Sequence, residues 1–370
     1  MKRKVLGIQL LSAHEKNRNN NFTVLRLVLA WLVLFGHSFP LTGTGFDPIS
    51  KLMMPYTWIG GIAVGGFFAV SGYLVSASIT QRSIPDFVAS RSLRLYPAII
   101  CYSLVAILII GPIAVKVPLS QYFEANPWEN LKNATLWDWI YNLPYAFANN
   151  PIPGSTNGSS WTLPAELRCY LLVLVFGFFG IFDTKTRANL ALFGLLILMR
   201  MSFPSVPVFG DNPRFESPLT FFVVGCLFWV NRAWIPLSWP LAIVAVVACV
   251  ASFAAVTPWS LYTYVFAVTY VIFMIVYRLP HLDMDAYGDF SYGIYIYAWP
   301  IQQLVWFSGQ NAYVNTLLAT LVILPVSYLS WRFVEKPALS LKKYLSRSPA
   351  SIVGETRGKS SNIELHTRNN

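Results

Sequence analysis

Charged residues are scarce in this chain. Only 12% of its 370 residues are Asp, Glu, Lys or Arg, whereas 55% are hydrophobic. A soluble protein normally carries about a quarter charged residues, so a soluble globular domain is excluded. Apolar runs of about 20 residues recur from end to end, and this is the length that an α-helix needs to cross a bilayer. The runs are continuous rather than alternating, which argues against a membrane β-barrel.

Cysteine is also rare, and its spacing does not indicate a metal site. All four cysteines lie inside apolar runs, without the spacing of metal ligands. Structural thiols are therefore favoured over disulfides, and no metal is predicted. The cysteines are Cys101, Cys169, Cys226 and Cys249.

The N-terminus lacks the pattern of a cleavable signal peptide. Residues 1–20 are basic and polar, so the first apolar run is expected to remain as a membrane helix. The C-terminal residues 341–370 are polar and Ser-rich, and we expect a disordered cytoplasmic tail there. Residues 21–340 then form one transmembrane domain.

The net charge of +11 does not indicate a nucleic-acid-binding protein, because the basic residues lie in the tails and in alternate loops. With the N-terminus in the cytoplasm, 20 of the 27 Lys and Arg residues fall on the cytoplasmic side and four on the outside. This positive-inside pattern predicts an all-α bundle of about ten transmembrane helices with both termini cytoplasmic. The predicted spans are 22–40, 58–80, 95–115, 161–182, 188–206, 217–231, 236–257, 259–278, 289–308 and 313–333.

The first predicted span contains two ionisable residues. Arg26 and His37 are eleven positions apart, which corresponds to about 16 Å along a helix. Both are costly in lipid, so each is expected to face a polar interior. Alternatively, Arg26 extends to the cytoplasmic headgroups and His37 is a hydrogen-bonded core residue. Because imidazole titrates near neutral pH, His37 is the candidate general base.

Polar residues of chemical interest also mark the second and third spans. Ser71 and Tyr73 place hydroxyl groups in mid-membrane and are candidates for a substrate channel. Arg91 and Arg94 are three residues apart, so they share a helix face at the cytoplasmic start of the third span. Two guanidiniums there suit a phosphorylated ligand that enters from the cytoplasm. The alternative is a purely topological function as positive-inside anchors.

The fourth and ninth spans add a carboxylate and a tyrosine. Glu166 and Arg168 are two residues apart and do not face each other, so each is expected to find a partner on another helix. Glu166 is predicted at the depth of His37, where its carboxylate would orient the imidazole. Tyr295 is a further candidate for the substrate channel. The aromatic external loop, 116–160, suits either sugar rings or a membrane-interface belt.

Taken together, six short motifs resemble the acyltransferase 3 family of bacterial integral membrane proteins, over residues 20–340. Each motif is weak alone, but all six occur in the family's order and on the expected topology. They are Arg26-x10-His37, Phe67-Phe68-x-x-Ser71-Gly72-Tyr73, Arg91-x-x-Arg94, Trp161-Thr-Leu-Pro-Ala-Glu166, Ser291-Tyr-Gly-Ile-Tyr295 and Glu335-Lys-Pro337.

The resemblance implies an enzyme that moves acyl groups, usually acetyl, from cytosolic acyl-CoA to hydroxyls of extracytoplasmic carbohydrates. It implies that His37 is the catalytic histidine, that Arg26 is its essential paired cation, and that Arg91 and Arg94 contact the CoA phosphates. Acetyl-CoA would be a co-substrate rather than a bound cofactor. The other partners would be a glycan or lipid-linked glycan acceptor and the bilayer of the bacterial inner membrane, with an envelope glycan-assembly protein or a second copy of the chain as further partners.

Two departures from the family pattern leave other functions open. Many members have a histidine where this chain has Ala298, so acid–base help from the late span is not expected. Many also append an extracytoplasmic hydrolase-like domain, which is not expected here, so the chain would act alone or pass its acyl group to a separate protein. A membrane transporter or acyl-group translocator and an envelope scaffold are the alternatives.

Overall fold

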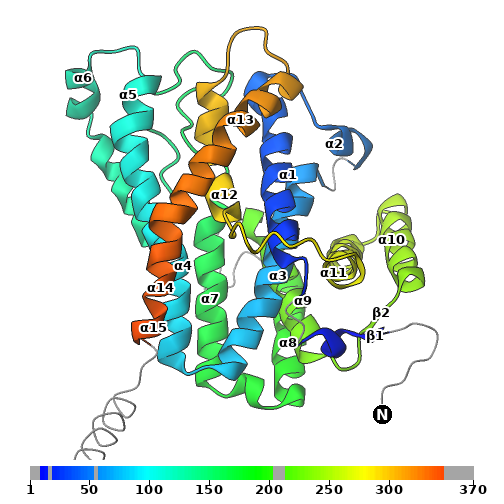
Figure 1. Ribbon diagram of the computed structural model, residues 1–370. Helices are drawn as coiled ribbons and strands as arrows, with labels where there is room; N and C mark the ends of the chain where they lie inside the picture. Colours follow the sequence, from blue (N-terminus) through cyan, green and yellow to red (C-terminus); the bar gives the residue numbers. More distant parts are fainter. Residues whose placement is uncertain (1–8, 16–18, 54–56, 203–212, 346–370) are drawn as a thin grey trace, which may run out of the picture.

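The computed structural model describes residues 9–15, 19–53, 57–202 and 213–345. Within these ranges the chain is almost entirely helical, as predicted, and its helices pack into a bundle (Figure 1). The long helices are α1 (Phe22–Thr42), α3 (Ile59–Gln81), α4 (Ile84–Val105), α7 (Thr162–Phe178), α8 (Lys185–Ser202), α9 (Glu216–Val230), α10 (Trp239–Ala254), α11 (Ser260–Arg278), α12 (Ser291–Leu304) and α13 (Ala312–Ser330). The short elements are β1 (Gln9–Leu10), η1 (Leu11–His14), α2 (Pro48–Met53), the π-helical turn η2 (Ala106–Ile110), α5 (Gly111–Ala114), α6 (Leu119–Glu124), η3 (Pro127–Thr135), η4 (Ile181–Asp183), η5 (Pro213–Phe215), β2 (Pro236–Leu237), the π-helical turn η6 (Trp331–Glu335), α14 (Lys336–Ser340) and α15 (Lys342–Leu345).

Each predicted span coincides with a helix, and most helix ends lie within a few residues of the predicted ones. In the described part of the chain, five helical stretches are long and apolar enough to cross a membrane, and two more apolar helices are shorter. The crossing of all ten helices and the cytoplasmic position of both termini therefore stay predictions. The five stretches are Phe22–Thr42, Ile59–Gln81, Ile84–Ala114, Ser260–Arg278 and Ala312–Ser340, and the shorter two are Glu216–Val230 and Trp239–Ala254.

Helix α4 begins eleven residues before the predicted third span, at Ile84 instead of residue 95. Its first turn is capped, because the Ser83 Oγ accepts a hydrogen bond from the Asp86 backbone N–H at 3.3 Å. Hydropathy misses these turns because Asp86, Arg91 and Arg94 interrupt the apolar pattern. Both arginines consequently lie on a fully formed helix, one turn apart.

The α3 and α9 backbones touch at the centre of the bundle. A Cβ atom on Gly72 would collide with the carbonyl oxygen of Phe222, and one on Gly225 would collide with that of Ala69. Small residues allow such close approach between membrane helices, so packing explains the glycines of this part of α3. On its other side α3 packs against α1, which also contacts α12 and α13 (Figure 1).

An irregular segment, residues 150–161, runs alongside α12 into the bundle, and we call it the re-entrant segment. Its residues Thr156, Asn157, Ser159 and Ser160 are at most 1% exposed. Buried irregular backbone needs hydrogen-bond partners within the protein, and α12 supplies them along its length. The pairs are Asn150 Nδ2 to the Gln303 carbonyl (2.8 Å), Trp299 Nε1 to the Ser155 carbonyl (3.1 Å), Asn157 Nδ2 to the Ile296 carbonyl (2.8 Å) and the Tyr295 hydroxyl to the Ser159 carbonyl (2.9 Å).

Helix α7 begins at Thr162, one residue from the predicted start of the span 161–182, but this start lies deeper in the bundle than predicted. Its first residue, Thr162, contacts Tyr295 with 2.6 Å between their hydroxyl oxygens. Tyr295 is one turn from Ser291, where α12 begins. The start of α7 thus lies beside the first turns of α12, far from the Gln303 end where the re-entrant segment enters.

We expect Asn157→Asp to destabilise the protein. The amide nitrogen of Asn157 donates to the Ile296 carbonyl at 2.8 Å, and its oxygen accepts from the Ser159 hydroxyl at 2.8 Å. Aspartate keeps the acceptor but loses the donor and buries a charge, which costs about 1–3 kcal/mol or more. The measurement is thermal unfolding of the solubilised protein, with the exposed Asn149→Asp as control. An unchanged Tm would show that this hydrogen bond does not hold the segment.

Part of the N-terminal tail is folded against the bundle. Strand β1 pairs antiparallel with β2, and Leu11 beside it is completely buried. The His14 ring stacks on Tyr277 with 4.9 Å between ring centroids. Partial burial, together with the nearby charge of Arg278, lowers the pKa of His14. Residues 1–8, 16–18, 54–56, 203–212 and 346–370, including most of the predicted disordered tail and the end of the predicted fifth span, lie outside the described residues.

Candidate active site

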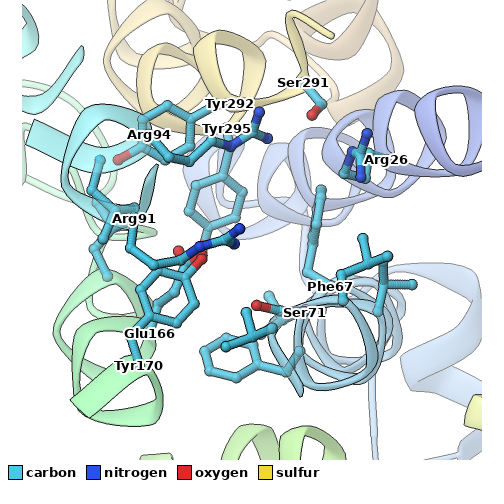
Figure 2. A pocket seen from close by; sticks show the side chains of 17 residues that line it. Arg26, Phe67, Ser71, Arg91, Arg94, Glu166, Tyr170, Ser291, Tyr292 and Tyr295 are labelled. Atoms are coloured by element: carbon cyan, nitrogen blue, oxygen red, sulfur yellow. The ribbon is translucent and has the colours of Figure 1, made fainter. Parts of the chain in front are cut away.

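A cavity of about 270 Å³ opens between α1, α3, α4, α7 and α12. It brings together six of the predicted site residues from five helices, as Figure 2 shows. These are Arg26, Ser71, Arg91, Arg94, Glu166 and Tyr295. The motifs that the sequence scatters over 270 positions thus converge on one site.

Arg26 and Arg94 share one carboxylate at the edge of this cavity. The Asp289 Oδ2 lies 2.9 Å from Arg26 Nε and 3.1 Å from Arg94 Nη2. Its Oδ1 accepts hydrogen bonds from the Ser291 hydroxyl at 2.5 Å and the Ser291 backbone N–H at 3.4 Å. Sequence reasoning left Arg26 without a partner and missed Asp289. The available signal was its position two residues before Ser291, where an Asp side chain can bond the first turn of a helix.

Arg91 is held differently, by aromatic rings. Its guanidinium lies 5.5 Å from the ring centroid of Tyr170 and 5.9 Å from that of Phe87. The Tyr170 hydroxyl donates a short hydrogen bond to the Glu166 carboxylate. Figure 2 shows the guanidinium of Arg91 directed toward this pair. Tyr170, four residues after Glu166, is a second site residue that the sequence analysis did not single out.

The remaining walls of the cavity are largely apolar. Tyr295 is fixed by its hydrogen bonds to Thr162 and the Ser159 carbonyl, and its ring packs against Phe67 with 6.0 Å between centroids. Ser71 adds a hydroxyl group between these walls. The apolar lining comes from Val64, Phe67, Phe68, Val70, Leu74, Val75, Leu95 and Leu163.

His37 lies outside the cavity, between two indole rings. Its ring centroid is 5.1 Å from that of Trp58 and 4.9 Å from that of Trp299. The Trp58 ring fits against α1 and α3 because Gly36 and Gly60 lack side chains, and a Cβ on either would collide with it. Among the described residues, His37 Nδ1 is buried without a hydrogen-bond partner.

The expected pairing of His37 with Glu166 is not formed. In the described structure, Glu166 lines the cavity with Arg26 and pairs with Tyr170, whereas His37 is eleven residues along α1 from Arg26. The physical reason is the depth of α7, since the re-entrant segment carries its first turn down to Tyr295. Glu166 therefore belongs to the arginine end of the site.

Tyr73 and Arg168 do not join the cavity either. The Tyr73 ring packs in the core against Phe273 and Trp229, with centroid distances of 4.8 Å and 5.4 Å. Arg168 lies over the Trp137 ring at 4.7 Å and donates to the Trp137 carbonyl at 3.2 Å. Its partners are thus Trp137 of the loop 116–160 and the ring of Phe215, whose centroid is 5.2 Å from the guanidinium.

The site combines an end lined by three arginines with a separate imidazole. Val64 on α3 lines the cavity, and Gly60, one turn away, contacts the Trp58 ring that packs on His37. One turn is about 5.4 Å, so the cavity ends close to the surroundings of His37. In the part of the chain that the structure describes, no three His, Cys, Asp or Glu side chains group as metal ligands.

Residues 19–332 match the model of a family described as acyltransferase domain. An O-acetyl transferase of Shigella phage Sf6 is 29% identical over 352 residues, which cover 91% of this chain and 99% of the relative. Nodulation protein 10 of Rhizobium leguminosarum bv. viciae is 25% identical over 377 residues, covering 92% of this chain and 98% of the relative. No solved structure matches the chain.

Proposed function

The chain belongs to the acyltransferase 3 family, and from this premise we propose that it transfers an acyl group, acetyl above all, from cytosolic acyl-CoA to a hydroxyl of an extracytoplasmic carbohydrate. The observation that carries the proposal is the convergence of Arg26, Arg91 and Arg94 on one mostly apolar cavity. Its lining residue Val64 lies one helical turn from Gly60, beside the Trp58 ring that packs on His37. The relative named O-acetyl transferase supports acetyl as the transferred group.

The donor binds from the arginine end. Arg91 and Arg94 offer guanidinium N–H groups for the phosphates of CoA, which they recognise by charge-assisted hydrogen bonds. The apolar walls accommodate the pantetheine arm. Arg26 and His37 are about 16 Å apart along α1, roughly the length of that arm when extended, so the thioester approaches His37.

The transfer step uses His37 as general base. The imidazole takes the proton of the acceptor hydroxyl, and the hydroxyl oxygen attacks the thioester carbonyl carbon. The C–S bond breaks, the ester forms, and the thiolate of CoA leaves and recovers the proton from the imidazolium. Glu166, through Tyr170, contributes at the donor end beside Arg91 rather than at His37.

The same proposal defines the setting of the reaction. The enzyme is a multi-pass protein of the bacterial inner membrane, with Arg91 and Arg94 toward the cytoplasm and His37 toward the outside. Its acceptor is a surface polysaccharide, an O-antigen or a lipid-linked precursor of these. The external loop exposes Trp128, Trp137 and Tyr145, between 44% and 52% accessible, and these rings are available to stack on sugar rings.

The test is transfer of labelled acetyl groups from acetyl-CoA to surface polysaccharide by the full chain in liposomes. We expect base-labile label in the polysaccharide, and a KM for acetyl-CoA that rises about tenfold or more in Arg91→Ala, because a charge-assisted phosphate contact is lost. Arg82→Ala, exposed at the end of α3, is the matched control. Uptake of label without ester formation would instead favour an acyl translocator, and an unchanged KM would refute the donor site.

A further inference from the structure

Asp289 connects three helices through one carboxylate. Its Oδ2 is shared by Arg26 of α1 and Arg94 of α4, at 2.9 Å and 3.1 Å, and it directly precedes α12 in the chain. Its Oδ1 is occupied by the backbone N–H and hydroxyl of Ser291. The residue is only 9% exposed, so these four contacts fix the carboxylate in a buried position.

The arginines, and not the carboxylate, face the cavity. Arg26, Arg94 and Ser291 belong to its lining, whereas Asp289 is absent from the described lining residues. Figure 2 shows Arg26 and Ser291 together on one side of the cavity, across from Glu166 and Tyr170. A guanidinium has five N–H donors over three nitrogens; Arg94 donates one N–H to Asp289, whereas Arg26 Nε meets the carboxylate as an ion pair without a hydrogen bond. The others remain for a ligand in the cavity.

The arginines outnumber the acids that contact them directly, which favours an anionic ligand, and the acids Glu166 and Asp285 lie nearby. Two guanidiniums that meet at one oxygen repel each other, and buried charges are tolerated only when paired. A second acid near Arg94, Glu335, is engaged by the Ser330 hydroxyl at 3.1 Å. Arg91, in contrast, is held by the rings of Phe87 and Tyr170. Asp289 thus contacts two of the three arginines that line the cavity, Arg26 and Arg94, but not Arg91.

We propose that Asp289 is a positioning residue that holds Arg26 and Arg94 as a single anion-binding pair for the phosphates of the donor. This inference rests on the proposed function, since it takes CoA as the donor. In this arrangement Arg26 binds the donor phosphates together with Arg94. Arg26 lies on α1, the helix that also contains His37.

The test compares CoA with pantetheine, which has the same arm but no phosphate. In Asp289→Asn of the purified full chain, we expect the Kd for CoA to rise about 10- to 100-fold, because charged hydrogen bonds are lost. The Kd for pantetheine should stay within about twofold, since the apolar walls are untouched. Asp289→Glu should restore part of the CoA affinity. Glu15→Gln is the matched control, because Glu15 also forms an ion pair with an arginine, Arg232, at 3.0 Å. Neither residue of this pair lines the cavity.

Each result decides between defined alternatives. CoA binding that is unchanged or tighter in Asp289→Asn overturns the positioning function, and a parallel loss of CoA and pantetheine makes the residue merely structural. If the unmodified protein does not bind CoA, the proposed donor fails and this inference fails with it. If Asp289→Asn does not accumulate, the variant Ser291→Ala tests the proposal in its place. It removes only the hydroxyl bond to Oδ1 and should weaken CoA binding about threefold or more at constant pantetheine affinity, whereas equal CoA affinity refutes the proposal.

Discussion

Replacing His37 by alanine is expected to abolish acylation of the surface carbohydrate while the protein stays in the membrane. No other histidine of the described chain lies within a predicted span, so no second imidazole can take the proton. Loss of a general base typically lowers a rate by about 10²- to 10⁴-fold. The measurement is mass spectrometry of the polysaccharide from cells that express each variant at matched abundance.

Two further variants separate chemistry from packing at this position. His37→Gln keeps a polar side chain between Trp58 and Trp299 but cannot act as a base, so it should be as inactive as alanine. His281→Ala changes an exposed histidine between α11 and α12 and should leave acetyl content unchanged. If acetyl content is the same with and without His37, the protein is not the enzyme for that polymer.

Gly225→Leu is expected to prevent accumulation of the folded protein. The new side chain would project at the Ala69 carbonyl on α3, and a backbone atom in the middle of a packed helix cannot move aside. Overpacking usually costs about 1–3 kcal/mol and more when the backbone itself must shift. Membrane abundance and thermal unfolding in detergent measure the effect, and Gly72→Leu should behave alike because it meets the Phe222 carbonyl.

Gly194→Leu provides the matched control for these glycine variants. Gly194 also lies within a helix, α8, but among the described residues nothing lies within 4 Å of a Cβ built there. It should therefore accumulate normally. Equal loss in all three variants would mean that helix propensity or insertion, and not the α3–α9 contact, limits accumulation.

Hydropathy sufficed to predict where the helices lie, because lipid demands long apolar runs. It failed where polar groups satisfy one another inside the protein. Helix α4 starts early because Ser83 caps turns that hold Asp86, Arg91 and Arg94. The re-entrant segment went unrecognised because its partners on α12 are about 140 to 150 residues away in sequence.

In the site, too, the residues could be predicted from local sequence features, whereas their pairing partners could not. The motifs correctly singled out residues that converge on the cavity, since arginines and a carboxylate in apolar runs are conspicuous. The pairing was not predictable: Asp289 is 195 residues from Arg94, and Glu166 was assigned to His37 because a straight span would have placed them at one depth. Tyr73 resembled a channel hydroxyl in sequence, yet its ring fills the core beside Phe273.

The short length of helix α12 affects how thick the apolar layer beside it is. Its 14 residues are about 21 Å long, whereas the hydrocarbon core of a bilayer is about 30 Å. In the proposed membrane orientation, the polar re-entrant segment beside α12 lies within the hydrocarbon core, which makes the apolar layer there thinner than in the surrounding membrane. In the proposed reaction, the donor stays on the cytoplasmic side and then needs to reach across only part of the bilayer. The pantetheine arm of the proposed donor would then span the distance of about 16 Å from Arg26 to His37 and present the acyl group to the acceptor on the other side.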